Sequence, residues 1–520
     1  MKKILLTISL LSIIPVVNSC KDAYDIQQAG EFSESATFKT TADMQLFLNE
    51  TYDKVNGVGE IEFTGLLTDE TSLGSQNGGQ NNGIYRFIIN PTTAAEGSSL
   101  ASMWLSHYQS INYANRLIRG AQSIVPTSSA DQAKYNSILA QARAIRAFCH
   151  FQLLSYFATD LKNDNAVGVI LQTTVPEDVT ESKPRNTVGE VFAQINTDLN
   201  YAETNLGTPA TGSISKWKFI SVDMINALRA RMNAYRGKYT EAELYADKVI
   251  NTSGLALSAA TPIPTGVVGS TTWNSQYYSS STTNPYRRML ADLEQGEVIF
   301  ALDRSVGKAT IGNIYYFNQT NLTGGPYMEM GRSLFNILNS SSGDIRRRAY
   351  VDPTSKVDAN YLTNPNYKLD DVLCIDKYPG KPSGAPLNND LKVFRLSEMY
   401  LIKAEARVVA NDLVGAATQV KKIRDARNYI APVALPVYAN NQAAWRDILL
   451  ERRVELAFEG HRYLDIKRLG TLAGVQVDRD VRDTENMPEK TMAPSDYRFT
   501  LPIPFEEVNA NLSIQQNPGY

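Results

Sequence analysis

Apolar residues recur at intervals of three and four positions through the first half of the chain. This period places them on one face of an α-helix. Thr41 or Asp43 stands at the start of the first run, where a capping side chain belongs. The pattern predicts helices over residues 41–55, 103–125, 130–157 and 187–206.

Two further segments share one helix–turn–helix pattern. In residues 220–250, small residues such as Ala230 and Ala242 let two antiparallel helices pack closely, and Gly237 supplies the left-handed turn between them. The unit recurs near the C-terminus, where Asn411 takes the place of Gly237. Asn is the usual second choice for a left-handed cap. This pattern resembles a tetratricopeptide repeat.

Between these helical segments lie two stretches with the composition of loops. Residues 56–100 are rich in Gly, Asn and Ser, and residues 252–390 are rich in Ser, Thr, Gly, Pro and Asn. The second stretch holds a short β-like run at 297–302 but little other sheet. A loop-rich region of this length in a compact protein is usually functional.

The N-terminus has the pattern of an exported lipoprotein. Residues 1–19 form a signal peptide, with two lysines, an apolar run too short to cross a bilayer, and Val17 and Ser19 in lipobox positions before Cys20. We expect lipid on Cys20 and a polar tether over 20–40. The alternative is an ordinary signal peptide in which Cys20 has no role.

Composition excludes several other classes. A net charge of −3 gives no support to a nucleic-acid partner. The three histidines are not at metal-ligand spacing, so we expect no metal site and no cofactor. Cys149 and Cys374 lie in apolar runs and are expected to be buried free thiols, with a bridge between them as the alternative.

An acidic and basic cluster marks the helix predicted over 441–458. Arg452 falls at the edge of its apolar stripe, among Glu451, Glu455 and Glu459. We expect a structural ion-pair network, because a partly buried arginine needs carboxylate partners. The alternative is an acid pair for glycoside hydrolysis, drawn from these glutamates and Asp465.

Several of these motifs together resemble the RagB/SusD family of outer-membrane nutrient-binding lipoproteins. ERRVELAFEGHRYLDIKRLG at 451–470 is similar to the family's signature, and FRLSEMYLIKAEA at 394–406 leads into the second repeat. QARAIRAFCHFQLLSYF at 141–157 is similar to the family's long helix, with Trp104 in the helix before it. The chain ends NPGY, a frequent ending in this group. The resemblance covers nearly the whole chain after Cys20.

The resemblance implies a mainly α fold, a tetratricopeptide-repeat-like scaffold of about four helix pairs that carries a loop-rich ligand region. It implies a lipid-anchored, outward-facing protein of the outer membrane that captures a glycan and delivers it to a SusC-like TonB-dependent transporter. No enzyme activity is implied. Residues 41–520 would form one domain, with helical repeats at about 41–56, 101–160, 185–251 and 392–470 and ligand loops at about 57–100 and 252–390.

Candidate glycan contacts are transferred by region, because binding residues differ among family members. Aromatic rings cover the apolar face of a sugar, and amide side chains answer its hydroxyls. Trp273 with Tyr277 and Tyr278 is the predicted platform, and the alternative is that these rings pack a region poor in other apolar residues. The remaining candidates are Tyr286, Tyr315 and Tyr316, with Gln80, Asn81 and Tyr85 in the earlier loop.

Three other functions fit the same chain. A receptor for peptides or another nutrient would use the same scaffold, with a deep groove in place of an aromatic shelf. A lipid-anchored glycosidase would turn over a polysaccharide and depend on Glu451 or Glu455. A purely structural scaffold would bind a partner barrel but no small ligand.

Overall fold

The computed structural model describes residues 37–91, 94–177, 181–207, 216–304, 311–315, 325–380, 388–485 and 487–520, and the side chains of 94–99 lie outside this description. The signal peptide, Cys20 and Tyr316 therefore lie outside the described residues.

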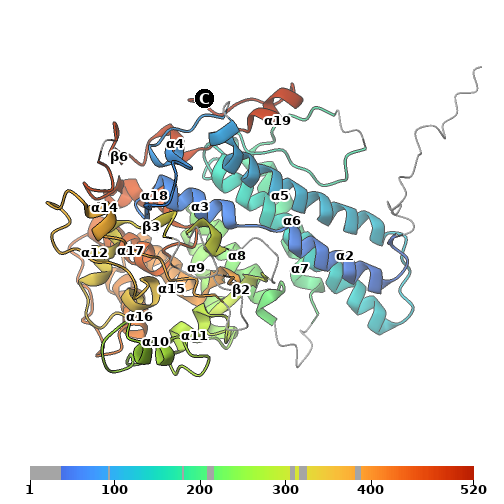
Figure 1. Cartoon of the computed structure of the whole chain (residues 1–520). Helices are drawn as coiled ribbons and strands as arrows, with labels where there is room; N and C mark the ends of the chain where they lie inside the picture. The colour runs from blue at the N-terminus through green and yellow to red at the C-terminus, as the bar shows by residue number, and fades with distance from the viewer. Residues whose placement is uncertain are drawn as a thin grey trace, which may run out of the picture.

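The helices predicted in the first half of the chain are confirmed, with shifts at their ends. Thr40 caps the first helix, with Asp43 completing a capping box, one residue before the predicted position. The third, α6, keeps its predicted bounds to within one residue, whereas the helix before it begins nine residues earlier than predicted. The helices are α2 (Thr41–Lys54), α5 (Ala94–Ala121), α6 (Ser129–Phe157) and α7 (Val188–Asn205). In Figure 1, α5, α6 and α7 lie side by side, on the right, and α2 packs across α5 and α6.

The first loop-rich stretch contains a helix that the sequence pattern missed. Helix α3 (Val58–Leu67) lies within it and buries seven of its ten residues. A helix enclosed on all sides has no polar face, so it shows no amphipathic period. The short helix α4 (Asn82–Tyr85) follows in the same stretch.

Both helix–turn–helix units form as predicted. The first consists of α8 (Val222–Tyr235) and α9 (Tyr239–Thr252), and the second of α15 (Leu396–Val409) and α16 (Leu413–Arg427). Gly237 has φ +71° and Asn411 has φ +58°, so each adopts the left-handed turn. Helix α15 packs against α8 and α9, and α17 (Asn441–Glu455) and α18 (Arg462–Ala473) extend the array.

The second loop-rich stretch consists of short elements, and it lies with α17 and α18 on the left of Figure 1. Its helices and 3-10 turns are α10 (Thr271–Tyr277), α11 (Pro285–Leu290), η3 (Ile311–Ile314), α12 (Arg332–Asn339), α13 (Arg346–Tyr350) and α14 (Tyr367–Asp370). One further 3-10 turn, η2 (Lys216–Lys218), precedes α8. The chain ends with η5 (Tyr497–Phe499) and α19 (Phe505–Ala510).

Three two-stranded antiparallel sheets tie distant segments together within the described residues. The predicted β-like run is β2 (Val298–Leu302), which pairs with β4 (Leu391–Arg395) immediately before α15. Strand β1 (Thr71–Leu73) pairs with β3 (Met328–Met330), so the two loop-rich stretches meet. Strand β5 (Val477–Asp478) pairs with β6 (Thr491–Met492) after the last long helix.

The expected ion-pair network is present and is fully buried. Glu455 at the end of α17 receives hydrogen bonds from three arginines, with Nη1 of Arg395 at 2.7 Å, Nη2 of Arg427 at 2.8 Å and Nη1 of Arg346 at 3.1 Å. Glu297, beside β2, binds Arg395 and Arg427 at 2.7 and 2.8 Å. The network therefore joins α17 to both β2 and α16.

The other residues of the signature segment are paired in the same way. Arg452 is fully buried, not at the edge of a stripe, and its Nε donates to Asp465 at 2.7 Å. Glu451 pairs with Arg346 at 2.6 Å, and Glu459 pairs with Arg395 at 2.8 Å. All four carboxylates of the glycosidase alternative are thus occupied by arginines in the interior.

Cys149 and Cys374 are buried free thiols, as predicted. None of the helices in the described part of the chain is long and apolar enough to cross a bilayer. No cluster of three or more His, Cys, Asp and Glu suited to a metal ion occurs among the residues described.

Candidate functional site

The predicted aromatic platform does not form an exposed shelf. Trp273 and Tyr277 are 1% and 0% exposed, and their rings stack with centroids 4.6 Å apart inside the loop-rich region. The Trp273 indole donates to the Pro264 carbonyl at 3.0 Å. The short helix α10 supplies much of the apolar material in this coil-rich segment, so its rings form the local core.

The other tyrosines of the second loop-rich stretch are also enclosed. Tyr286 and Tyr315 are buried, and Tyr286 hydrogen-bonds Tyr350 at 2.5 Å. Tyr278 is half-buried, with its hydroxyl donating to Asp376 at 2.8 Å. These rings stabilise the region, and in this arrangement they leave no flat aromatic surface for a sugar.

We expect Trp273→Ala to destabilise the protein. Removing a fully buried indole from a packed cluster typically costs about 3–5 kcal/mol. Thermal unfolding followed by circular dichroism should show a clear drop in the transition temperature. Retention of the wild-type unfolding temperature would mean that the ring is exposed in solution, as the platform interpretation requires.

The three candidate glycan contacts in the first loop-rich stretch differ in their exposure. Gln80 is exposed, and Asn81 adopts a left-handed conformation while its amide donates to Glu62 at 3.0 Å. Tyr85 is buried against a cavity, and its hydroxyl donates to the Asp483 carbonyl at 2.7 Å. Of the nine candidate contacts, Tyr85 alone among those described lines this cavity.

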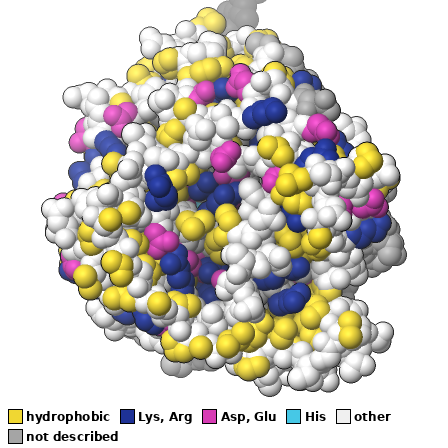
Figure 2. Space-filling model, turned by 90° about the vertical axis from the view of Figure 1, so that its left-hand side faces the viewer, with side chains coloured by type: hydrophobic (Ala, Val, Ile, Leu, Met, Phe, Trp, Pro, Cys, Tyr) yellow, Lys and Arg dark blue, Asp and Glu magenta, His cyan; other side chains and the backbone are white. Residues whose placement is uncertain are grey.

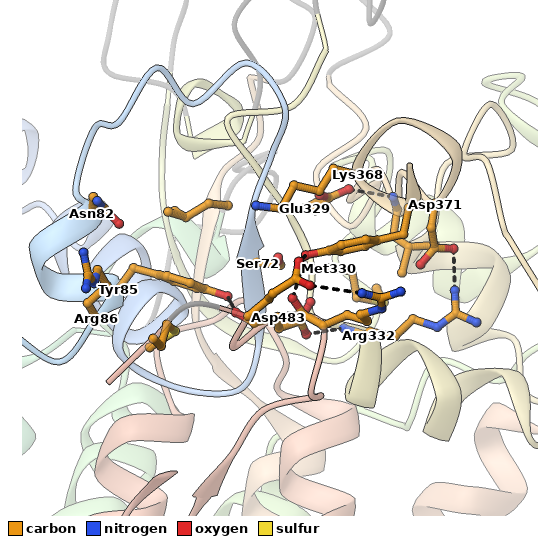
Figure 3. Close-up of a pocket in the computed structure, with 16 residues that line it drawn as sticks. Ser72, Asn82, Tyr85, Arg86, Glu329, Met330, Arg332, Lys368, Asp371 and Asp483 are labelled. Carbon is orange, nitrogen blue, oxygen red and sulfur yellow. Dashed lines mark hydrogen bonds and ion pairs between the residues drawn. The ribbon is translucent and has the colours of Figure 1, made fainter. Parts of the chain in front are cut away.

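This cavity, of about 220 Å³, is built from three segments far apart in sequence (Figure 3). One wall comes from β1 and α4, a second from β3, α12 and α14, and a third from the chain after α18. Its lining consists of Ser72, Leu73, Asn82, Tyr85, Arg86, Glu329, Met330, Arg332, Tyr367, Lys368, Asp371, Leu373, Arg482, Asp483, Glu485 and Met487.

The pairing of β1 with β3 sets the distance between the first two walls. Ser72 lies opposite Glu329 in the register, and both line the cavity. Gly74 follows β1 at a point where a Cβ would lie 2.1 Å from the Pro326 carbonyl oxygen. Only glycine allows this close approach, which brings the two loop-rich stretches together.

Two arginines of the cavity are held by acids and aromatic rings. Arg332 pairs with Asp371, and its guanidinium lies 3.8 Å from the centroid of the Tyr361 ring. Arg482 pairs with Glu485 at 3.2 Å and lies 4.5 Å from the ring of Tyr367. These contacts fix the guanidinium groups in position without a ligand.

Two carboxyl groups of the cavity have raised pKa values. Burial raises the pKa of Glu329 to about 8, and the nearby Asp483 and Asp371 add to this effect. Burial likewise raises the pKa of Asp483 to about 7. Glu329 accepts from the Leu373 backbone N–H at 3.0 Å, and Asp483 accepts from that of Arg332 at 2.8 Å. Near neutral pH these groups can donate as well as accept hydrogen bonds.

Figure 2 looks at the left-hand side of Figure 1 and shows a hollow in this face, with basic side chains gathered in it and acidic ones beside them. Basic and acidic side chains therefore line this hollow, among hydrophobic side chains that spread over the rest of the face.

The third wall was missed at the sequence level because it follows the signature segment and contains no aromatic residue. Its alternating charges, from Arg479 to Glu485, were the available signal. Arg479 fixes this wall by donating to the carbonyl oxygens of Thr68, Tyr85 and Leu66 at 2.7, 2.6 and 2.5 Å.

Comparisons with known proteins agree with this architecture. The family model described as "SusD family" matches residues 308–520, and the model described as "Starch-binding associating with outer membrane" matches residues 31–214. SusD-like protein P2 of Formosa agariphila is 25% identical, and the match covers 100% of both chains.

Solved structures share the fold. A SusD superfamily protein from Bacteroides thetaiotaomicron superposes with a TM-score of 0.72 at 22% identity, over 92% of this chain and 100% of that one. A laminarin-binding SusD-like protein superposes with a TM-score of 0.65 at 21% identity, over 93% of this chain and 100% of that one. The two SusD-type family models together match most of the chain, which therefore belongs to the SusD/RagB family.

Proposed function

We propose that the protein is a cell-surface receptor that captures an oligosaccharide and passes it to a SusC-like TonB-dependent transporter. The observation that carries the proposal is the cavity in Figure 3, where both loop-rich stretches expected to bind ligand meet. Membership of a family of binding proteins, one of whose structural neighbours binds laminarin, supports it. Lipid on Cys20 would hold the receptor at the outer surface.

The lining suits a sugar by its mixture of groups. The lining contains carboxyl, guanidinium and amide groups, such as those of Asp371, Arg332 and Asn82. These groups can form hydrogen bonds with the hydroxyl groups of a sugar, as donors or acceptors. Leu73 and Met330 offer apolar surface to the C–H faces of a ring. A small open site of this kind allows release as well as capture, as transport requires.

A larger cavity, of about 470 Å³, lies between the end of α6 and α18. Its walls are scaffold helices and the segment 494–500, with Lys467 donating to the carbonyl oxygens of Ser155 and Ala158 at the end of α6. Since neither loop-rich stretch reaches it, we assign the ligand to the smaller cavity.

We expect Asn82→Trp to abolish oligosaccharide binding. Asn82 is exposed at the rim of the cavity, so an indole there fills the opening without disturbing the core. Isothermal titration calorimetry against a panel of soluble oligosaccharides should give heat with the wild-type protein and none with this variant.

Val267→Trp is the matched control, because Val267 is exposed and lies outside the cavity lining. It should bind like the wild type. Equal binding by Asn82→Trp and the wild type would place the site elsewhere. Heat from a peptide library but from no glycan would support the peptide-receptor alternative.

A further inference from the structure

Arg86 is the cationic group of the cavity whose hydrogen bonding is incomplete. It follows α4 and lines the cavity, and its Nε is buried without a hydrogen-bond partner. Within the described ranges, its guanidinium makes no ion pair either. The two Nη groups of Arg86 are not enclosed in this way and make no hydrogen bond to a described residue, so they can donate to an acceptor on a ligand.

The other arginines near it are already satisfied. Arg332 and Arg482 pair with Asp371 and Glu485, and Arg479 donates to three backbone carbonyls. Among these arginines, Arg86 is therefore the one whose guanidinium lacks partners within the described residues.

Lys368 supplies a second uncommitted charge. It stands exposed on α14, with its ammonium 6.0 Å from the Tyr367 ring centroid, and none of the described residues forms an ion pair with it. Figure 3 places Arg86 with Tyr85 and Asn82 on one side of the cavity and Lys368 near Asp371 on the other. Two free cations thus flank one opening.

The carboxyl groups of the cavity do not cancel these charges at neutral pH. Asp371 and Glu485 are committed to Arg332 and Arg482. Burial raises the pKa of Glu329 to about 8 and that of Asp483 to about 7, so one is mostly protonated and the other is about half protonated near pH 7. These raised pKa values reduce the negative charge that faces Arg86 and Lys368 near pH 7.

We infer that the sugar captured here is anionic, with a carboxylate or sulfate group seated against the Arg86 guanidinium and within reach of the charge on Lys368. This inference rests on the proposed function and specifies its substrate class. Guanidinium groups bind planar or tetrahedral oxyanions through paired N–H donors, and this geometry favours an acidic over a neutral sugar. A ligand with an amino group would instead meet two like charges.

The test compares charged and neutralised forms of the same sugar chains by calorimetry. Oligogalacturonate and its methyl ester form the carboxylate arm, and a galactan oligosaccharide with and without sulfate esters forms the sulfate arm. Laminarin oligosaccharides serve as a neutral reference. Binding in one arm only identifies which oxyanion the site takes.

The charged form of the bound chain should bind at least about tenfold more tightly than its neutral form, the size expected for one charge-assisted contact. Arg86→Gln should remove this advantage, so that the charged and neutral forms bind this variant with similar affinities. Arg347→Gln is the matched control, because it removes a charge whose Nε contacts Asn339 outside the cavity. Affinity should also fall as salt rises from about 50 to 500 mM.

The affinity for the charged form should decrease as pH rises from 6 to 9. Deprotonation of Glu329, which faces Lys368, Asp371 and Asp483, adds negative charge beside the ligand. Deprotonation of Asp483, which faces Asp480, Arg479 and Ser72, does the same.

The outcomes separate the two proposals. Equal or tighter binding of the neutral forms, or unchanged charged binding in Arg86→Gln, overturns the anionic class while leaving a glycan receptor in place. Absence of heat from every chain, charged or neutral, overturns the proposed function itself.

Discussion

Replacing Glu455 by glutamine is expected to lower the free energy of unfolding by about 3–5 kcal/mol, because it removes one partner from a buried ion-pair network. Glu455 is 0% exposed and binds Arg346, Arg395 and Arg427. Burial alone would raise the pKa of Glu455, but Arg427 and Arg395 hold it well below its ordinary value. The three guanidinium groups would therefore be left without their central anion.

Chemical denaturation of the purified protein measures this effect. Glu241→Gln is the matched control, since Glu241 is exposed in the first turn of α9 and should change stability by less than about 1 kcal/mol. A Glu455→Gln variant as stable as the wild type would contradict the structural role. Polysaccharide turnover by the wild type, lost in this variant without loss of fold, would revive the glycosidase alternative.

Asp69→Asn is expected to have a comparable effect on stability and a second effect on the cavity. Asp69 lies just before β1 and accepts two hydrogen bonds from Arg462 of α18, both at 2.8 Å. Its backbone carbonyl accepts from Arg453 of α17 at 2.9 Å. The pair anchors the start of the first wall on the scaffold, so a neutral amide should cost about 3–5 kcal/mol and weaken ligand binding.

The effect of Asp69→Asn should depend on pH. Burial opposes ionisation, but Arg453 and Arg462 hold the pKa of Asp69 below its ordinary value. An acid with a depressed pKa contributes stability that is complete above its unfolded pKa, about 4, and is lost as pH falls below that value. The difference in stability between wild type and variant should therefore shrink from pH 6 towards pH 2.

Denaturation at several pH values checks this account, with the exposed Asp370→Asn as control. A difference that stays constant, or that grows towards acid pH, would show that the Asp69 charge is not what holds β1 to α18.

The helical scaffold was predictable from sequence because its signals are local. The spacing of apolar residues predicts α6 and α7 from nearby positions alone. The turn residues Gly237 and Asn411 likewise depend only on the residues around them. Helix α3 was missed because a helix buried on every side has lost its polar face. Trp273 was predicted to contact the ligand, but its side chain is likewise enclosed and belongs to the core.

The cavity was predictable only in outline. The two loop-rich stretches that form its first walls were expected to bind ligand, but their pairing through β1 and β3 depends on a contact between residues far apart in the chain. The third wall, with Arg482 and Asp483, follows the most recognisable motif and carries no aromatic signal. Residues that line a cavity one at a time, from segments far apart in the chain, leave no pattern that a single sequence reveals.

We propose that the ligand lies in the cavity between β1, α14 and the segment after α18. A crystal structure of the protein with the tightest-binding oligosaccharide of the panel tests it directly. We predict sugar density in contact with all three walls, including Arg86, Lys368 and Arg482. Density confined to another surface, such as the larger cavity beside α18 or the exposed loop at Gln80, would show that the ligand binds elsewhere.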